Sequence, residues 1–266
     1  MLLAELATLF RRMRVKALLG VLAAIPAALA VAVYFSGGPS TGRGPTFLDQ
    51  VSHNGMFAAL AGLTVTIPFF LPLVVAVVSG DALAGEANLG TLRYLLTRPS
   101  GRTRLLATKA ATVAIFCLAA TVAVALGGLI AGIILFPVGR VVTLSGTTLP
   151  LTSGIVRTFV AAGIVGASLL GLASIGLFIS TITDAPVGAM AATAGFAVLS
   201  AVLDAVPQTH AIHPWLFTHH WLAFGDIIRT PVQWHNILAD LQLQAGYIAV
   251  FAAAAWARFS TKDVLA

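Results

Sequence analysis

The chain has 266 residues, of which 59% are hydrophobic and 9% are charged, and its mean hydropathy is +0.98. Soluble domains carry about 25% charged residues, so this composition excludes an ordinary water-soluble globule. The high hydrophobicity also excludes intrinsic disorder, which requires a polar and highly charged chain. The formal net charge of +6 would point to nucleic acid in a soluble protein. In a membrane protein, an excess of basic residues instead indicates how the chain is oriented in the membrane, and we expect no nucleic-acid partner.

The first sixteen residues have the pattern of an amphipathic helix. Their apolar side chains recur at helical spacing, while Glu5, Thr8, Arg11 and Arg12 occupy the other face. This pattern predicts a helix that lies in the headgroup plane before the chain enters the membrane. The apolar positions are Leu2, Leu3, Leu6, Leu9, Phe10 and Met13.

Six apolar blocks follow along the chain, each about as long as the 20 residues that a membrane-spanning helix requires. We therefore predict an all-α integral membrane protein with six transmembrane helices, forming a single transmembrane domain over residues 1–266. Pro68 and Pro72 in the second block should kink that helix, as a hinge or as a static bend. The predicted spans are residues 17–35, 56–78, 110–138, 158–182, 187–206 and 238–259.

The first block also imitates a cleavable signal peptide, because basic residues precede an apolar run that ends in small residues at Ala28 and Ala30. The run is longer than a typical signal core, and five further apolar blocks follow it. We therefore predict a retained transmembrane helix.

The Lys and Arg residues are distributed unevenly between the two sides of the predicted membrane domain. Eleven of the 15 fall in the N-terminal segment, in the loop after the second span and in the C-terminal tail. Cytoplasmic loops carry the excess of Lys and Arg, so both termini are expected in the cytoplasm. Arginine outnumbers lysine twelve to three and alanine is abundant, a composition that favours a bacterial source and therefore a bacterial inner membrane. The eleven are Arg11, Arg12, Arg14, Lys16, Arg93, Arg98, Arg102, Arg104, Lys109, Arg258 and Lys262, against Arg43, Arg140, Arg157 and Arg229 on the other side.

The predicted cytoplasmic segment after the second span, residues 79–108, combines charged residues with an apolar ridge. Asp81 and Glu86 stand where the helix reaches the cytosol, and Gly90 allows a tight turn. A short amphipathic helix is expected next, before Arg98 and the proline that follows it. Such a segment is suited to docking against another protein.

Small residues in the third and fourth spans predict faces for close helix packing. Gly128 and Gly132 form a Gly-x-x-x-Gly pair in the third span. Gly163, Ala167 and Gly171 repeat at four-residue spacing in the fourth. Contacts within one subunit are favoured over dimerisation, although the pattern fits both.

The predicted outer segment before the sixth span is rich in Trp, Phe, Leu, Ile and His. Trp215 and Trp221 suit the membrane interface, so a short interfacial helix or a re-entrant hairpin is expected. The histidines could assemble a metal site, but cysteine and carboxylate partners are sparse, and we predict no metal. They are His210, His213, His219, His220 and His235.

Residues that would support catalysis are missing from the predicted spans. No span carries paired carboxylates or a His-Glu-x-x-His metal motif, and all histidines fall outside the spans. The chain has no Gly-Lys pair and so no phosphate-binding loop of the Gly-x-x-x-x-Gly-Lys type. We therefore expect a non-catalytic subunit without a cofactor of its own, and any energy for transport must come from a partner.

The order of motifs after the second span resembles that of the ABC-2 family of ATP-binding-cassette transporter permeases. Members of that family carry, in this order, an acidic residue, a glutamate, a Gly-Thr pair, a Leu-Leu pair, a Pro-x-x-Arg and a lysine. The amphipathic N-terminal helix, the six spans and the outer segment are also similar to the family plan. The matching residues are Asp81, Glu86, Gly90-Thr91, Leu95-Leu96, Pro99-Ser100-Gly101-Arg102 and Lys109.

The resemblance implies the membrane permease subunit of an exporter. Two copies, or one copy and a related permease, would pair, and two separate ATPase subunits carrying ATP and Mg would dock at a coupling helix between the second and third spans. The residues it implies for coupling are Asp81, Glu86, Gly90, Thr91, Leu95, Leu96, Arg98 and Arg102.

The alternative is a stand-alone channel or membrane-assembly protein that binds a non-ATPase partner. In that case Asp81, Glu86 and Arg102 would be solvated loop charges or headgroup anchors. The spans offer mainly Ser, Thr and aliphatic side chains, so the mild preference is for a lipophilic or amphipathic substrate taken from the membrane.

Overall fold

The computed structural model of the protein describes residues 1–36, 47–90 and 101–261. Within these residues, six helical stretches are long and apolar enough to cross a membrane, as the sequence predicts. They are Met13–Phe35 (α2), Phe70–Asn88 (α5), Arg102–Leu135 (α7), Leu151–Ile182 (α8, Leu151–Ser168, followed by α9, Leu170–Ile182), Pro186–Ala205 (α10) and Trp234–Thr261 (α11). A further helix, Leu2–Arg11 (α1), precedes them, and the extended backbone at Arg12 joins it to α2.

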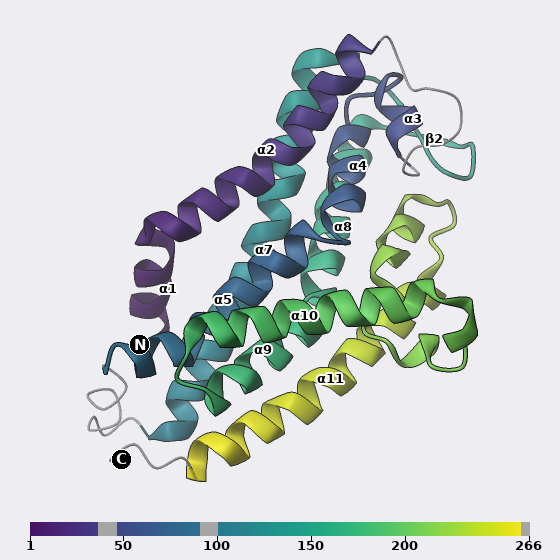
Figure 1. Cartoon of the computed structure of the whole chain (residues 1–266). Coiled ribbons are helices and arrows are strands. Elements are labelled where there is room, and N and C mark those ends of the chain that lie inside the picture. The colour runs from purple at the N-terminus through teal and green to yellow at the C-terminus, as the bar shows by residue number, and fades with distance from the viewer. Residues whose placement is uncertain (37–46, 91–100, 262–266) are drawn as a thin grey trace.

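Helix α7 is central to the bundle and packs against α2, α4, α5 and α8. Helix α2 lies along one flank, and α10 and α11 lie along the other (Figure 1). These flanking helices bury few of their residues. Val187 and Val250 are examples of their exposed apolar side chains. Exposed apolar faces of this kind are expected where a protein meets lipid.

The second predicted span is not one continuous helix. The chain forms α4 (Phe57–Thr66), turns over residues 67–69, and starts again as α5. The prediction of one helix over residues 56–78 is therefore wrong. Pro68 lies in the interruption, whereas Pro72 lies in the first turn of α5, where a missing N–H breaks no helical bond. Helix α5 also continues to Asn88, ten residues beyond the predicted end.

Glycine allows α7 to approach its neighbours at backbone distance. A Cβ on Gly128 would lie 2.5 Å from the Cα of Ala59 in α4, and a Cβ on Gly132 would collide with the backbone of Gly55. This glycine pair therefore packs within the chain. The series in the fourth span does not form one interface, because Gly163 has open space beside it while Gly171 faces Gln244 of α11.

At the end of the bundle where α7 finishes, a short hairpin departs from the predicted all-α fold. Strand β1 (Val141–Val142) pairs antiparallel with β2 (Thr148–Leu149), next to a single helical turn, α3 (Leu48–Val51). The segment before α11 forms three 3₁₀ helices, Pro207–Thr209 (η1), His213–Trp215 (η2) and Trp221–Ile228 (η3). Helix η3 buries Trp221 and Phe224 in the core, whereas Trp215 of η2 is 72% exposed. This segment is therefore partly core and partly surface.

Candidate functional site

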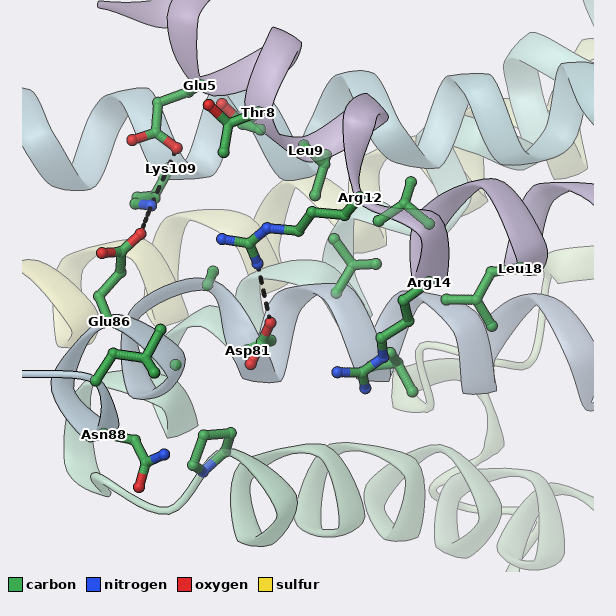
Figure 2. A pocket seen from close by; sticks show the side chains of 18 residues that line it. Glu5, Thr8, Leu9, Arg12, Arg14, Leu18, Asp81, Glu86, Asn88 and Lys109 are labelled. Atoms are coloured by element: carbon green, nitrogen blue, oxygen red, sulfur yellow. Dashed lines mark hydrogen bonds and ion pairs between the residues drawn. The ribbon is translucent and has the colours of Figure 1, made fainter. Parts of the chain in front are cut away.

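The candidate site is a cavity of about 490 Å³ near the start of α7. Its walls come from α1, α2, α5, α7 and the first residue of α10, which are far apart in the sequence (Figure 2). Three acidic and three basic side chains line it, so their formal charges cancel. These are Glu5, Asp81, Glu86, Arg12, Arg14 and Lys109.

Lys109 of α7 is the central residue of this cavity, and it is only 5% exposed. Its Nζ donates to Oε2 of Glu5 in α1 at 3.0 Å and to Oε1 of Glu86 in α5 at 2.9 Å. Figure 2 shows the ammonium group lying between the two carboxylates. A buried ammonium is stable only with such partners, because desolvation of an unpaired charge is costly. We call Glu5, Glu86 and Lys109 the ionic junction, because they join three separate elements.

A second ion pair links the α1–α2 turn to α5. Nη1 of Arg12 lies 3.3 Å from Oδ2 of Asp81, and the Arg12 side chain is 46% exposed (Figure 2). Gly85, one turn after Asp81, leaves room for this carboxylate, because a Cβ there would lie 2.6 Å from Oδ1 of Asp81. An exposed pair of this kind contributes about 0–1 kcal/mol, so it is the weaker of the two links.

The acidic end of α5 is bonded through its backbone to α9. The Ser180 hydroxyl of α9 donates to the Gly80 carbonyl at 2.8 Å, and it accepts from the N–H groups of Leu83 and Ala84 at 2.9 and 2.8 Å. Gly80 also allows α10 to approach, since a Cβ there would lie 2.7 Å from the backbone nitrogen of Met190. A displacement of this part of α5 would therefore be transmitted to both helices.

The structure brings only some of the predicted coupling residues together. Asp81 and Glu86 line the cavity, and Gly90 follows the end of α5 with a positive φ of 68°. Arg102 lies in the first turn of α7, and its Nη1 donates to the carbonyls of Phe259 and Ser260 at 3.2 and 2.9 Å. Arg102 thereby supplies a hydrogen-bond donor to two carbonyl groups in the last turn of α11, where helical N–H partners are missing. The predicted residues Thr91, Leu95, Leu96 and Arg98 lie outside the described residues, as does Lys262 of the tail.

Sequence reasoning missed the partners that complete this site. The sequence predicts Glu5 and Arg12 only on the polar face of the first helix, with Arg12 also as a marker of orientation. The available signal was an acidic residue within an otherwise basic N-terminal segment. Its pairing with Lys109, 104 residues further along the chain, depends on the tertiary fold.

A buried polar cluster in α11 was also missed. Asp240 is fully buried and accepts a hydrogen bond from the Ser168 hydroxyl. Gln244, one turn later, donates to Oδ1 of Asp240 at 3.0 Å and to the Phe217 carbonyl at 2.8 Å. The sequence placed this region at the polar start of the last span and predicted no role for it. His235, predicted outside the spans, lies in the first turn of α11.

Comparison with known proteins gives one local likeness and one match over most of the chain. Over 63 residues the chain is 40% identical to a protein of Pseudomonas aeruginosa named "Probable ABC transporter permease protein NosY". That likeness covers 24% of this chain and 23% of the relative, so the chain matches less than a quarter of the relative's length. Residues 22–265 match the family described as "Protein of unknown function (DUF2705)". Because this match includes nearly all of the helical bundle, the chain belongs to the DUF2705 family.

Proposed function

We propose that the chain is the transmembrane permease subunit of an ATP-binding-cassette exporter, with ATP hydrolysis on separate subunits. Three features support this proposal: the six apolar helices, the local likeness to a probable ABC transporter permease, and the ABC-2-like order of motifs from Asp81 to Lys109. The chain itself would contribute the substrate path and no catalysis.

The observation that carries the proposal is the ionic junction. It ties together the helices on both sides of residues 89–101, the segment where an ATPase subunit would dock. A push on that segment would act first on the end of α5. The junction would pass the motion to α1, and Ser180 would pass it to α9. The ATPase could then move the transmembrane helices through contacts that are already present, without touching them inside the membrane.

The remaining topology follows from the same proposal. Both termini face the cytoplasm of a bacterial inner membrane, α1 lies in the headgroup plane, and segment η1–η3 lies at the outer interface, where it is interfacial or re-entrant. Two permease copies, or one copy and a related permease, pair with two ATPase subunits. The preferred substrate class is a lipophilic or amphipathic compound.

The interruption between α4 and α5 is the proposed hinge of this permease. Residues 67–69 form a turn between the two helices, and Pro68 lies among them. At such a break, the angle between the two flanking helices can change with little loss of backbone hydrogen bonds. Helix α5 would then move relative to α4 when the cytoplasmic end is pushed.

The decisive experiment is purification of the chain from its native membrane in a mild detergent. We expect a phosphate-binding-loop ATPase, identified by mass spectrometry, to co-purify in stoichiometric amount and to hydrolyse ATP in the complex. Recovery of the chain without an ATPase, also after cross-linking in the membrane, would contradict the proposal. It would favour a channel or assembly protein with another partner.

A matched pair of variants then tests the coupling role. Glu86→Gln removes one carboxylate of the ionic junction, and it should leave the ATPase bound while lowering transport per ATP hydrolysed in vesicles. Asp226→Asn removes a carboxylate that is also ion-paired, with Arg229 at 2.9 Å, but lies within η3 at the opposite end. It should leave transport per ATP unchanged. Equal effects of the two variants would remove the coupling role from Glu86.

A further inference from the structure

A cluster of two histidines and an aspartate lies at the end of the bundle opposite the ionic junction. Asp204 comes from the last turn of α10, and His213 and His219 come from the segment that follows it. One potential ligand atom from each of the three residues lies within 4.8 Å of the others. Nδ1 of His219 donates a hydrogen bond to Oδ1 of Asp204 at 2.6 Å, and a bound metal ion would displace this proton. Nδ1 of His213 lies 3.9 Å from the same oxygen.

Hydrogen bonds on the far side of the His213 ring determine which nitrogen is free to bind a ligand. Nε2 of His213 lies 3.2 Å from the Val206 carbonyl and 3.2 Å from the Thr209 hydroxyl. A carbonyl can only accept, so Nε2 carries the hydrogen, and Nδ1 presents its lone pair toward Asp204. A ring oriented by a backbone carbonyl in this way is typical of histidines that bind metals.

The spacing of the cluster fits a small metal ion. Ligand atoms bound tetrahedrally at about 2.0–2.1 Å from zinc lie about 3.3 Å apart. The distances from Oδ1 of Asp204 to the two Nδ1 atoms, 2.6 and 3.9 Å, lie on either side of that value. Small side-chain rotations would equalise them, because all three side chains are partly exposed.

The chemistry of the donor set narrows the class of ion. Two imidazole nitrogens and one carboxylate oxygen suit zinc and related divalent transition metals, whereas calcium and magnesium prefer sites built from oxygen alone. Three protein ligands leave one tetrahedral position, and the partial exposure of the cluster allows water or an external group to fill it.

The sequence predicts no metal here because carboxylates are sparse near the histidines, but the fold brings Asp204 to two of them. We propose that Asp204, His213 and His219 bind a divalent transition metal ion, with zinc as the best match. The ion would fasten the segment after α10 to the end of that helix. This site is independent of the proposed transport function, because it lies at the other end of the molecule and shares no residue with the ionic junction.

Metal titration of the full chain tests this site. The protein is purified with an affinity tag that lacks histidines, stripped with a chelator and titrated with zinc chloride, with calcium and magnesium chloride as comparisons. We expect one zinc per chain and no competition from calcium or magnesium. Failure of the wild-type chain to bind zinc would overturn the proposal.

Substitutions assign the ligands. We expect zinc binding to weaken at least about tenfold in each of His213→Gln, His219→Gln and Asp204→Asn. Loss of a residue that only hydrogen-bonds to a metal ligand already costs about tenfold, so loss of a ligand should cost at least as much. His210→Gln is the matched control, because it changes an exposed histidine of the same segment outside the cluster. An equal loss in His210→Gln, or unchanged binding in His219→Gln, would contradict the assignment.

A measurement on the wild-type chain avoids any folding defect in the variants. X-ray absorption at the zinc edge should show two imidazole nitrogens and oxygen ligands at about 2.0–2.1 Å. A spectrum with oxygen ligands alone would overturn the proposal whatever the variants do. The zinc titration and the absorption spectrum involve no ATPase. Their results therefore do not depend on whether the proposed transport function is correct.

Discussion

At the end of the bundle formed by α1, α5 and α7, the buried cation Lys109 binds two carboxylate side chains. At the opposite end, Arg157 of α8 binds two backbone carbonyls, those of Ile227 and Arg229, at 3.1 and 3.0 Å. Side-chain partners can follow a moving helix by changing rotamer, whereas backbone carbonyls are fixed by the fold around them. The comparison indicates an adjustable ionic end and, opposite it, an end that is fixed by backbone carbonyls.

The largest expected effect is that of removing the central cation of the ionic end. Lys109→Met leaves two carboxylates facing one another, and we expect the free energy of unfolding to fall by about 3 kcal/mol. This value is at the low end of the range for a broken buried pair, because both carboxylates are partly exposed. Thermal unfolding in detergent, followed by tryptophan fluorescence, measures the loss.

Two further variants control for the loss of packing in Lys109→Met. Lys109→Arg keeps the charge and should lose less stability. Adding Glu86→Leu to Lys109→Met should recover part of the loss, because replacing both partners by apolar groups is less costly than leaving one unpaired. An unchanged unfolding midpoint in Lys109→Met would show that the junction does not stabilise the fold.

The next largest effect should come from the fixed end. Arg157→Met leaves the two carbonyls without their donor, at an expected cost of about 2 kcal/mol. Because these acceptors are neutral, the loss should be the same at low and high salt. Arg157→Lys keeps a charged donor and should lose less. A loss of stability that depends strongly on salt would show that Arg157, like Lys109, is held by charged partners, and would contradict the contrast between the two ends.

A smaller effect is expected where η3 enters the core. Nε1 of Trp221 donates to the Ser168 carbonyl at 3.2 Å, and Trp221→Phe removes this bond at a cost of about 1 kcal/mol. The matched control is Trp215→Phe, which changes an exposed ring of the same segment and should leave thermal unfolding unchanged. Equal losses would place both tryptophans in the same kind of environment.

The smallest effect is expected at the exposed pair beside the junction. Asp81→Asn removes the partner of Arg12 and should cost less than about 1 kcal/mol. Screening at about 1 M salt, where the Debye length is about 3 Å, should remove the difference from the wild type. Unfolding midpoints measured across a salt series provide the check. A difference that persists at high salt would mean that this pair is not screened by solvent.

The spans could be predicted from the sequence because apolar length is a local property. Hydropathy located the apolar part of each helix but not its ends, since polar first turns such as the one at Arg102 are still helical. Hydropathy could not detect the interruption at residues 67–69, where the side chains on both sides remain apolar. Pro68 predicted a kink there but not the end of one helix and the start of another. The hairpin after α7 was missed for a related reason, since two-residue strands carry almost no pattern.

The site was harder to predict than the spans. The end of the second apolar block places Asp81 and Glu86 where a helix leaves the membrane, which is a local inference. The pairing of Lys109 with Glu5 depends on how α1 folds back along α7, and no pattern within either segment encodes it. Asp240 is polar enough to suggest a helix end, yet Ser168 and Gln244 supply the hydrogen bonds that allow its burial.

The length of α7 has a consequence for how the protein responds to its membrane. A helix of 34 residues is about 51 Å long at 1.5 Å per residue, whereas the hydrocarbon layer is about 30 Å thick. Even at a tilt of 40°, α7 extends about 39 Å along the membrane normal. Part of it must therefore leave the hydrocarbon, and Lys109 lies two turns from its first residue. Bilayer thickness then determines how much water reaches this lysine. A thinner membrane should let more water reach it and weaken its ion pairs, and a thicker membrane should strengthen them.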